Sequence, residues 1–193
     1  MPAHSRTTGP PLTFALTLPL PPEARGTGFD HVFLNWNPHG HPPGEVYRVP
    51  HFDVHFYMIP PAAREAIRPE DPDFMAKAAR HPEPRFVPVD HVPPHEPEPV
   101  PGMGVHWVDA TTPELHGEPF THTLLYGSWD GRFIFIEPMV TKAVLDGRQT
   151  IAAPVKQPAE VAVPGRYPTQ YRIEFDAARR EHRIVLDGLV ARR

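Results

Sequence analysis

The chain has 193 residues, enough for one domain to bury most of its apolar surface without disulfides or structural metals. It contains no Cys, which excludes disulfides, thiolate metal sites and cysteine nucleophiles. The formal net charge is -4 and no basic run is present, so we expect no nucleic-acid partner.

Alternating apolar residues and β-branched runs predict short strands along most of the chain. In chain order these strands are expected at residues 13–18, 30–36, 46–49, 52–59, 105–108, 120–126, 132–138, 171–175 and 183–186. The sequence WDGR at residues 129–132 predicts an Asp-Gly hairpin turn. Short helices are expected at 61–67 and 73–79, and a single helical turn at 140–145. Residues 82–101 carry too many prolines for regular structure, which predicts a surface loop or arm.

Many short strands separated by turn residues predict a mainly β fold, either an antiparallel barrel or a sandwich, with one or two short helices and long Pro-rich loops. We expect residues 1–28 to form an N-terminal segment with one strand, and residues 29–193 to form a single β domain. No segment is long and apolar enough to predict a membrane span. The chain alone therefore predicts a soluble, cytoplasmic protein, or an extracytoplasmic one if a presequence has been removed.

The unusual chemistry lies in residues 37–57, NPHGHPPGEVYRVPHFDVHFY, within a chain that has 13 histidines. Imidazole is a common ligand of zinc, iron and copper and needs no thiolate partner. On a strand, His51, Asp53 and His55 all point to one face. Residues four apart on a strand are separated by about 13 Å, so His51 and His55 cannot share one ion, whereas each can share one with Asp53.

Further ligands must come from other segments. The predicted pool is His41, His51, His55, His106 and Glu137, from which three or four residues would bind one divalent metal: Zn, Fe or Mn. Asp53 would orient a ligand or act as a general base. The alternative is structural, with turn histidines at residues 39 and 41, a polar ladder at 51–55 and a hydrogen-bonded interior pair at 106 and 137.

A second pattern in this stretch is H-x-H-x3-E, formed by His39, His41 and Glu45, which matches the ligand core of the first cupin motif. Pro42, Pro43 and the spacing of the glycines argue against a cupin strand. The remaining histidines are expected to be ordinary loop or surface residues: His31, His81, His91, His95, His116, His122 and His182.

The blocks NPHGHPPGEVYRVPHFDVHFYMI, MGVHWVD, YGSWDGRFIFIEPM and PVKQP, in this order, resemble a family of uncharacterised bacterial His-rich β-proteins. Its best-known member is a thermophile protein controlled by an extracytoplasmic-stress sigma factor and its anti-sigma factor. The resemblance covers roughly residues 29–189 and implies a β-rich fold and assembly into a homodecamer. It implies no established activity and no catalytic residues.

Three functions remain open from the sequence. The first is a metal-binding β-barrel protein of stress-response type, either a metal-dependent hydrolase or an oxygenase-like enzyme. The second is a non-enzymatic homo-oligomer that binds a small apolar molecule or an envelope component. The third is a pH sensor, because histidines gain charge below about pH 6.5. A cluster that faces solvent favours the first function, and a sealed, fully paired cluster favours the second.

Overall fold

The computed structural model describes residues 14–42, 45–95 and 98–193, and these form a mainly β fold of antiparallel sheets. The main sheet has seven strands and is open, with β1 and β4 at its edges. In spatial order its strands are β1 (Phe14–Pro19), β2 (His31–Asn37), β3 (His51–Tyr57), β7 (Arg132–Thr141), β6 (His122–Trp129), β5 (Val105–Asp109) and β4 (His91–Val92).

Two smaller sheets and several short helices complete the described part of the chain. The three-stranded sheet contains β11 (Glu181–Asp187), β10 (Gln170–Asp176) and β8 (Ile151–Pro154), and the two-stranded sheet contains β12 (Val190–Arg192) and β9 (Gly165–Tyr167). The α-helices are α1 (Pro61–Glu65), α2 (Phe74–Ala78) and α3 (Lys142–Asp146), and the 3-10 helices are η1 (Pro22–Ala24), η2 (Pro84–Phe86) and η3 (Pro113–His116). None of these helices is long and apolar enough to cross a membrane.

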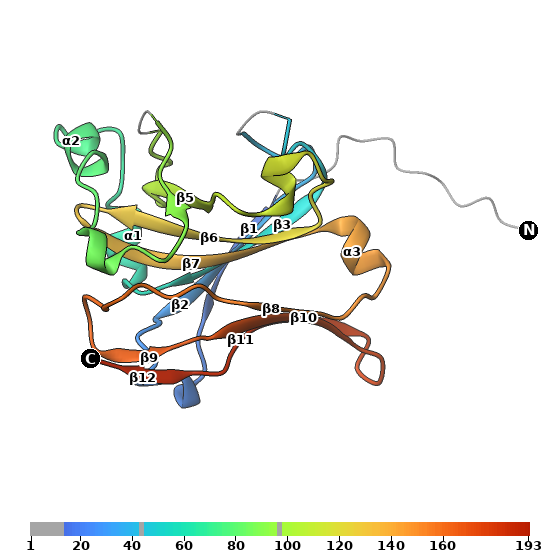
Figure 1. The fold of residues 1–193 in the computed structure, drawn as a ribbon. Coiled ribbons are helices and arrows are strands. Elements are labelled where there is room, and N and C mark those ends of the chain that lie inside the picture. The colour runs from blue at the N-terminus through green and yellow to red at the C-terminus, as the bar shows by residue number, and fades with distance from the viewer. Residues whose placement is uncertain (1–13, 43–44, 96–97) are drawn as a thin grey trace, which may run out of the picture.

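The main sheet separates two chemically different layers. On one side, β8 to β12 lie against it, and Tyr171 and Ile173 of β10 share a core cluster with Ile136 and Val140 of β7. On the other side lie α2 and the segments around β5 (Figure 1), and Arg64 of α1 lies over the Phe33 ring. Because side chains alternate along a strand, β3 sends Phe52 toward the first layer and its histidines toward the second.

The prediction of a mainly β, antiparallel fold is confirmed, and most predicted strands are present. Those at 13–18, 30–36, 52–59, 105–108, 120–126, 132–138, 171–175 and 183–186 correspond to β1, β2, β3, β5, β6, β7, β10 and β11, although residue 13 lies outside the described residues. The WDGR hairpin is also confirmed, since Asp130 and Gly131 both have positive φ, at 49° and 81°. The predicted helices at 61–67 and 73–79 correspond to α1 and α2.

The predicted strand at 46–49 is wrong. Residues 45–47 form a turn, because Tyr47 buries its ring to 1% exposure and its carbonyl accepts a hydrogen bond from the amide of His41. The helical turn expected at 140–145 begins two residues later, as α3, since Val140 and Thr141 still belong to β7. The Pro-rich segment 82–101 is mainly irregular but contains η2 and β4; its residues 96–97 lie outside the described residues.

The ladder between β3 and β7 is interrupted at its middle. The strands pair from His51 to Asp53 and again at Phe56 and Tyr57, but Val54 and His55 have no partner in the register. Pro138 lies in the corresponding part of β7, where it has no amide hydrogen to donate, and such a proline is unusual inside a sheet. The interruption lies where the functional side chains gather.

Candidate metal centre

Six side chains with metal-binding groups gather on the face of the main sheet that α1, α2 and the β5 segments cover. They form two separate groups, and within each group the candidate ligand atoms all lie within 4.8 Å of one another. We call His55, His106 and Glu137 the central triad, and His41, His51 and Asp53 the loop triad. Three of the six come from β3, one each from β5 and β7, and one from the loop that follows β2.

The central triad joins three strands of the main sheet. Glu137 is 1% exposed, and its two oxygens face one histidine each. The distances are 3.2 Å from Oε1 to Nε2 of His55 and 3.5 Å from Oε2 to Nε2 of His106. The His55 side chain is fully buried, whereas that of His106 is 25% exposed. The triad is therefore deep on the β3 side and open to solvent on the β5 side.

Hydrogen bonding fixes which ring nitrogen of His55 faces Glu137. Nδ1 lies 3.2 Å from the Phe33 carbonyl oxygen, which only accepts, so Nδ1 carries the proton and donates. In the neutral ring Nε2 then presents a lone pair to the Glu137 carboxylate. His55 Nε2 and Glu137 Oε2 are both buried without a hydrogen-bond partner among the described residues. Two acceptors facing each other in a buried site require either a shared proton or a cation.

Burial controls the charges of the central triad. It lowers the pKa of His55 to about 4 and that of His106 to about 3, so both imidazoles are neutral at pH 7. Burial, together with the nearby negative charge of Asp53, raises the pKa of Glu137 well above its usual range. Neutral imidazoles are the form that binds metals, and a divalent cation would restore the charged form of Glu137.

Phe135 packs the rings of the central triad in place. Its ring centroid lies 4.9 Å from that of His55 and 5.4 Å from that of His106, and its side chain is fully buried. This position exists because Gly127 of β6 has no side chain: a Cβ there would lie 2.0 Å from the Phe135 ring. Gly127 therefore allows the Phe135 ring to pack directly against the β6 backbone, in the position where it contacts both histidines.

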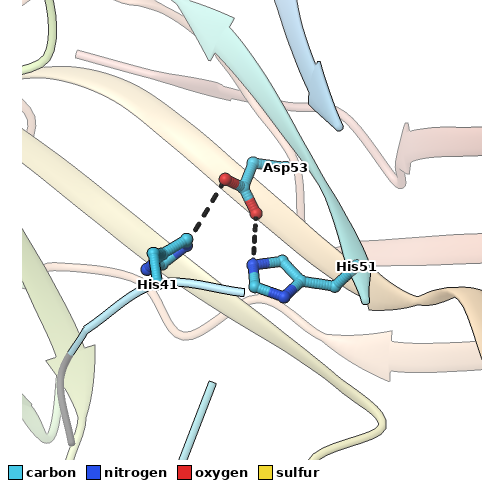
Figure 2. A group of neighbouring side chains, drawn as sticks. All are labelled: His41, His51 and Asp53. Atoms are coloured by element: carbon cyan, nitrogen blue, oxygen red, sulfur yellow. Dashed lines mark ion pairs between the residues drawn. The ribbon is translucent and has the colours of Figure 1, made fainter. Parts of the chain in front are cut away.

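The loop triad is centred on the carboxylate of Asp53 (Figure 2). Its Oδ1 lies 3.1 Å from Nε2 of His51, and its Oδ2 lies 3.4 Å from Nε2 of His41. Asn37 donates a 2.6 Å hydrogen bond to Oδ2 and so fixes the orientation of the carboxylate. Nδ1 of His51 donates to the Val49 carbonyl at 2.7 Å, which leaves Nε2 as an acceptor that faces the carboxylate.

The charges of the loop triad differ from those of the central triad. Burial alone would raise the pKa of Asp53, but its interactions with the nearby imidazoles of His41 and His51 outweigh burial and lower it. Burial also opposes the charged form of His41, yet Asp53 outweighs it and raises the pKa of that imidazole. In the metal-free triad, Asp53 is therefore ionised, and its charge favours the protonated form of the nearby His41 imidazole.

The ligand distances in both triads suit a small divalent ion. Four bonds of about 2.1 Å in tetrahedral geometry place ligand atoms about 3.4 Å apart. The nitrogen-to-oxygen distances are 3.2 and 3.5 Å in the central triad and 3.1 and 3.4 Å in the loop triad. Three protein ligands in each triad leave at least one coordination position for water or substrate.

The structure brings together all of the sequence-predicted site residues, but in two groups rather than around one point. The expectation that His51 and His55 cannot share an ion agrees with this division. Asp53, expected to act as an orienting residue or general base, has its oxygens in the same position relative to the histidines as those of Glu137. The cupin-like set is not assembled, because His39 is exposed and the Glu45 side chain is 90% exposed.

Some residues of this region were not recognised from the sequence. Asn37 and Tyr47 support the loop triad, and Gly127 and Phe135 support the central triad. A glycine within an otherwise apolar strand was the one available signal, and it pointed to Gly127.

The expectation that the remaining histidines are ordinary loop or surface residues is wrong for two of them. His31 and His91 are buried to 2% and 6% exposure. The His31 ring stacks on Tyr57, and Nδ1 of His91 donates to a main-chain carbonyl. In each ring, Nδ1 has a partner and Nε2 is buried without one among the described residues, and neither residue belongs to a group of three potential ligands.

Comparison with known proteins gives no further guidance, since no family model, no curated protein and no solved structure matches the chain.

Proposed function

We propose that this protein binds a divalent transition-metal ion in the central triad and uses it in a metal-dependent reaction of hydrolase or oxygenase type. The observation that carries the proposal is the convergence of two neutral imidazoles and one buried carboxyl group, whose ligand atoms all lie within 4.8 Å of one another. Among the described residues, His55 Nε2 and Glu137 Oε2 have no hydrogen-bond partner, and a bound cation would displace the proton of Glu137 and use these groups as ligands.

The donor set favours zinc, iron or manganese. Two imidazoles and one carboxylate occur in catalytic zinc sites and in the facial triads of non-haem iron oxygenases, and both leave coordination positions free. A bound ion of this kind would supply an activated water or a site for a small oxidant. The part-exposed side of His106 is the side from which a substrate would approach.

The proposal is tested by reconstitution. Tag-free, chelator-treated protein is incubated with zinc, iron or manganese, and the bound ions are counted per chain. Glu137→Gln removes the negative ligand but keeps a side-chain N–H that can donate to Nε2 of His55, so the variant should fold and lose the central ion. Glu118→Gln, at an exposed carboxylate, is the matched control. Wild-type ion content at the central triad in Glu137→Gln would refute the proposal.

The alternative function is a non-enzymatic protein that binds a small apolar molecule. An apolar cavity of about 110 Å³ lies away from both triads and is lined in part by Met58, Phe86 and Phe133. Binding of a hydrophobic fluorescent probe to wild type, with loss of that binding in Phe86→Asp, would support the alternative. Both triads are part-exposed, and each has buried nitrogen and oxygen atoms without a hydrogen-bond partner among the described residues, which favours metal binding over this function.

Assembly into a homo-oligomer, a homodecamer by family resemblance, belongs to the same proposal. In its support, all six residues of the edge strand β1 are exposed, and Phe14, Leu16 and Leu18 form an apolar row on it. Light scattering measures the molar mass of wild type and of Leu16→Lys and so tests oligomer formation. A monomeric wild type would refute oligomer formation and leave the proposal of metal binding unaffected.

A further inference from the structure

The second group of ligands has its own chemistry. In the loop triad, His51 Nε2 and Asp53 Oδ1 are buried and lie 3.1 Å apart, and neither atom has a hydrogen-bond partner in the part of the chain that the structure describes. Because Nδ1 of His51 already donates to a main-chain carbonyl, its Nε2 is an acceptor in the neutral ring. An acceptor and a carboxylate oxygen therefore face each other here, as they do in the central triad.

The loop triad cannot contribute to an ion held by the central triad. Asp53 and His55 are alternate residues of β3, with Cα atoms about 6.5–7 Å apart, and the ligand atoms of the six side chains fall into two groups rather than one. Each carboxylate also directs both oxygens to the histidines of its own group. Two ions would therefore occupy two distinct sites.

The third ligand of the loop triad is placed by a specific turn. Gly40 has a φ of +68°, and a Cβ at this position would lie 1.9 Å from the Tyr47 carbonyl oxygen. The same oxygen accepts the amide of His41 at 3.2 Å, and the Tyr47 ring is buried. The turn thus holds His41 over Asp53, while its side chain remains 33% exposed. Its exposure gives an ion direct access from solvent.

We infer that the loop triad of His41, His51 and Asp53 is a second divalent-metal site, separate from the central triad and dependent on the turn around Gly40. This inference goes beyond the ion of the proposed function and does not require it. Each bound ion adds positive charge near the other triad, so Coulomb repulsion weakens the second binding event and separates the two affinities.

The test uses zinc alone as the probe. Tag-free, chelator-treated protein is titrated with zinc against a competing chelator, and bound zinc is counted after desalting. The variants are His41→Ala and His106→Ala, which each remove a part-exposed ligand from one triad. The control is His39→Ala, an exposed histidine two residues from His41 that belongs to neither triad. Unfolding curves of the metal-free variants confirm that each one folds.

Wild type and the control should bind two zinc ions per chain in two affinity classes. Each single-triad variant should bind one, and the double variant none. Asp53→Asn should also bind one; its side-chain oxygen can still accept from Asn37, and its side-chain N–H can donate to His51 Nε2. The inference is overturned if wild type binds one ion that His106→Ala removes, an outcome that leaves the proposed function intact. It is also overturned if His41→Ala and Asp53→Asn both retain two ions. If the proposed function is wrong and only the loop triad binds metal, wild type should bind one ion, which His41→Ala removes and His106→Ala does not.

Discussion

Replacing Gly127 by Ala should disturb the central triad without touching any ligand. The new Cβ would lie 2.0 Å from two carbons of the Phe135 ring, whereas normal carbon contacts begin near 3.5 Å. The ring would have to move by about 1.5 Å, yet it is fully buried between Tyr57, His55 and His106. Overpacking of this kind costs about 1–3 kcal/mol of unfolding free energy.

Displacement of the Phe135 ring should also displace the imidazoles of His55 and His106, which pack against it. Changes in the groups that orient metal ligands weaken metal affinity by about 10-fold to 100-fold, and we expect a loss in that range for zinc at the central triad. Urea denaturation of the metal-free protein measures the stability change, and zinc titration against a competing chelator measures the affinity.

Two further variants make the Gly127→Ala test specific. Gly165→Ala is the control, because its φ is not positive and its Cβ meets the nearest atoms at an ordinary 3.4 Å. Adding Phe135→Leu to Gly127→Ala should recover part of the loss, so that the double variant is less destabilised than the sum of the single ones. Wild-type stability together with wild-type zinc affinity in Gly127→Ala would show that the Phe135 ring does not position the ligands.

Three other results are expected. Gly40→Ala should lower zinc binding at the loop triad at least ten-fold and leave the central triad unchanged, because the turn that places His41 cannot accept a Cβ; equal losses at both triads in the chelator titration would contradict this. Removing bound metal with a chelator should lower the thermal midpoint, since a ligand at one hundred times its Kd contributes about 2.7 kcal/mol; a midpoint independent of zinc concentration would speak against binding to the native state. The unfolding free energy of the metal-free protein should fall as pH drops below about 6.5, because burial lowers the pKa of His91 and of His122, so that the unfolded chain takes up protons that the folded one does not. That stability is fully present above pH 6.5 and is lost as pH falls toward the folded pKa values; denaturation at several pH values measures it, and His91→Gln should weaken the dependence.

Local sequence patterns predicted most strands of the main sheet, because the spacing of apolar residues depends on whether one or both faces of a strand are buried. β3 alternates polar and apolar residues, and β6 and β7 are long apolar runs, so their positions followed from periodicity. β8, β9 and β12 have only three or four residues each and show too short a pattern to be recognised. Residues 46–49 have a strand-like composition, but the burial of Tyr47 selects a turn instead.

The candidate site was predictable as a set of residue types but not as two groups. The alternation on β3 placed His51, Asp53 and His55 on one face, and this required only local geometry. The partners of these residues depend on strand order: Glu137 reaches His55 because β7 lies next to β3, and His106 arrives from β5, two strands beyond β7. Such long-range neighbours are set by tertiary packing, which the spacing of residues along one chain does not encode.

The gap in the β3–β7 ladder gives metal binding a mechanical consequence. Where Pro138 removes a main-chain donor, the two strands are joined across the gap by His55 and Glu137 instead. An ion bound by both side chains would link β3 and β7 across the gap through coordinate bonds. Of the amide hydrogens of Val54 and His55, any that faces β7 should then exchange fast in metal-free protein and slowly once the ion is bound, while those at the ends of both strands stay unchanged.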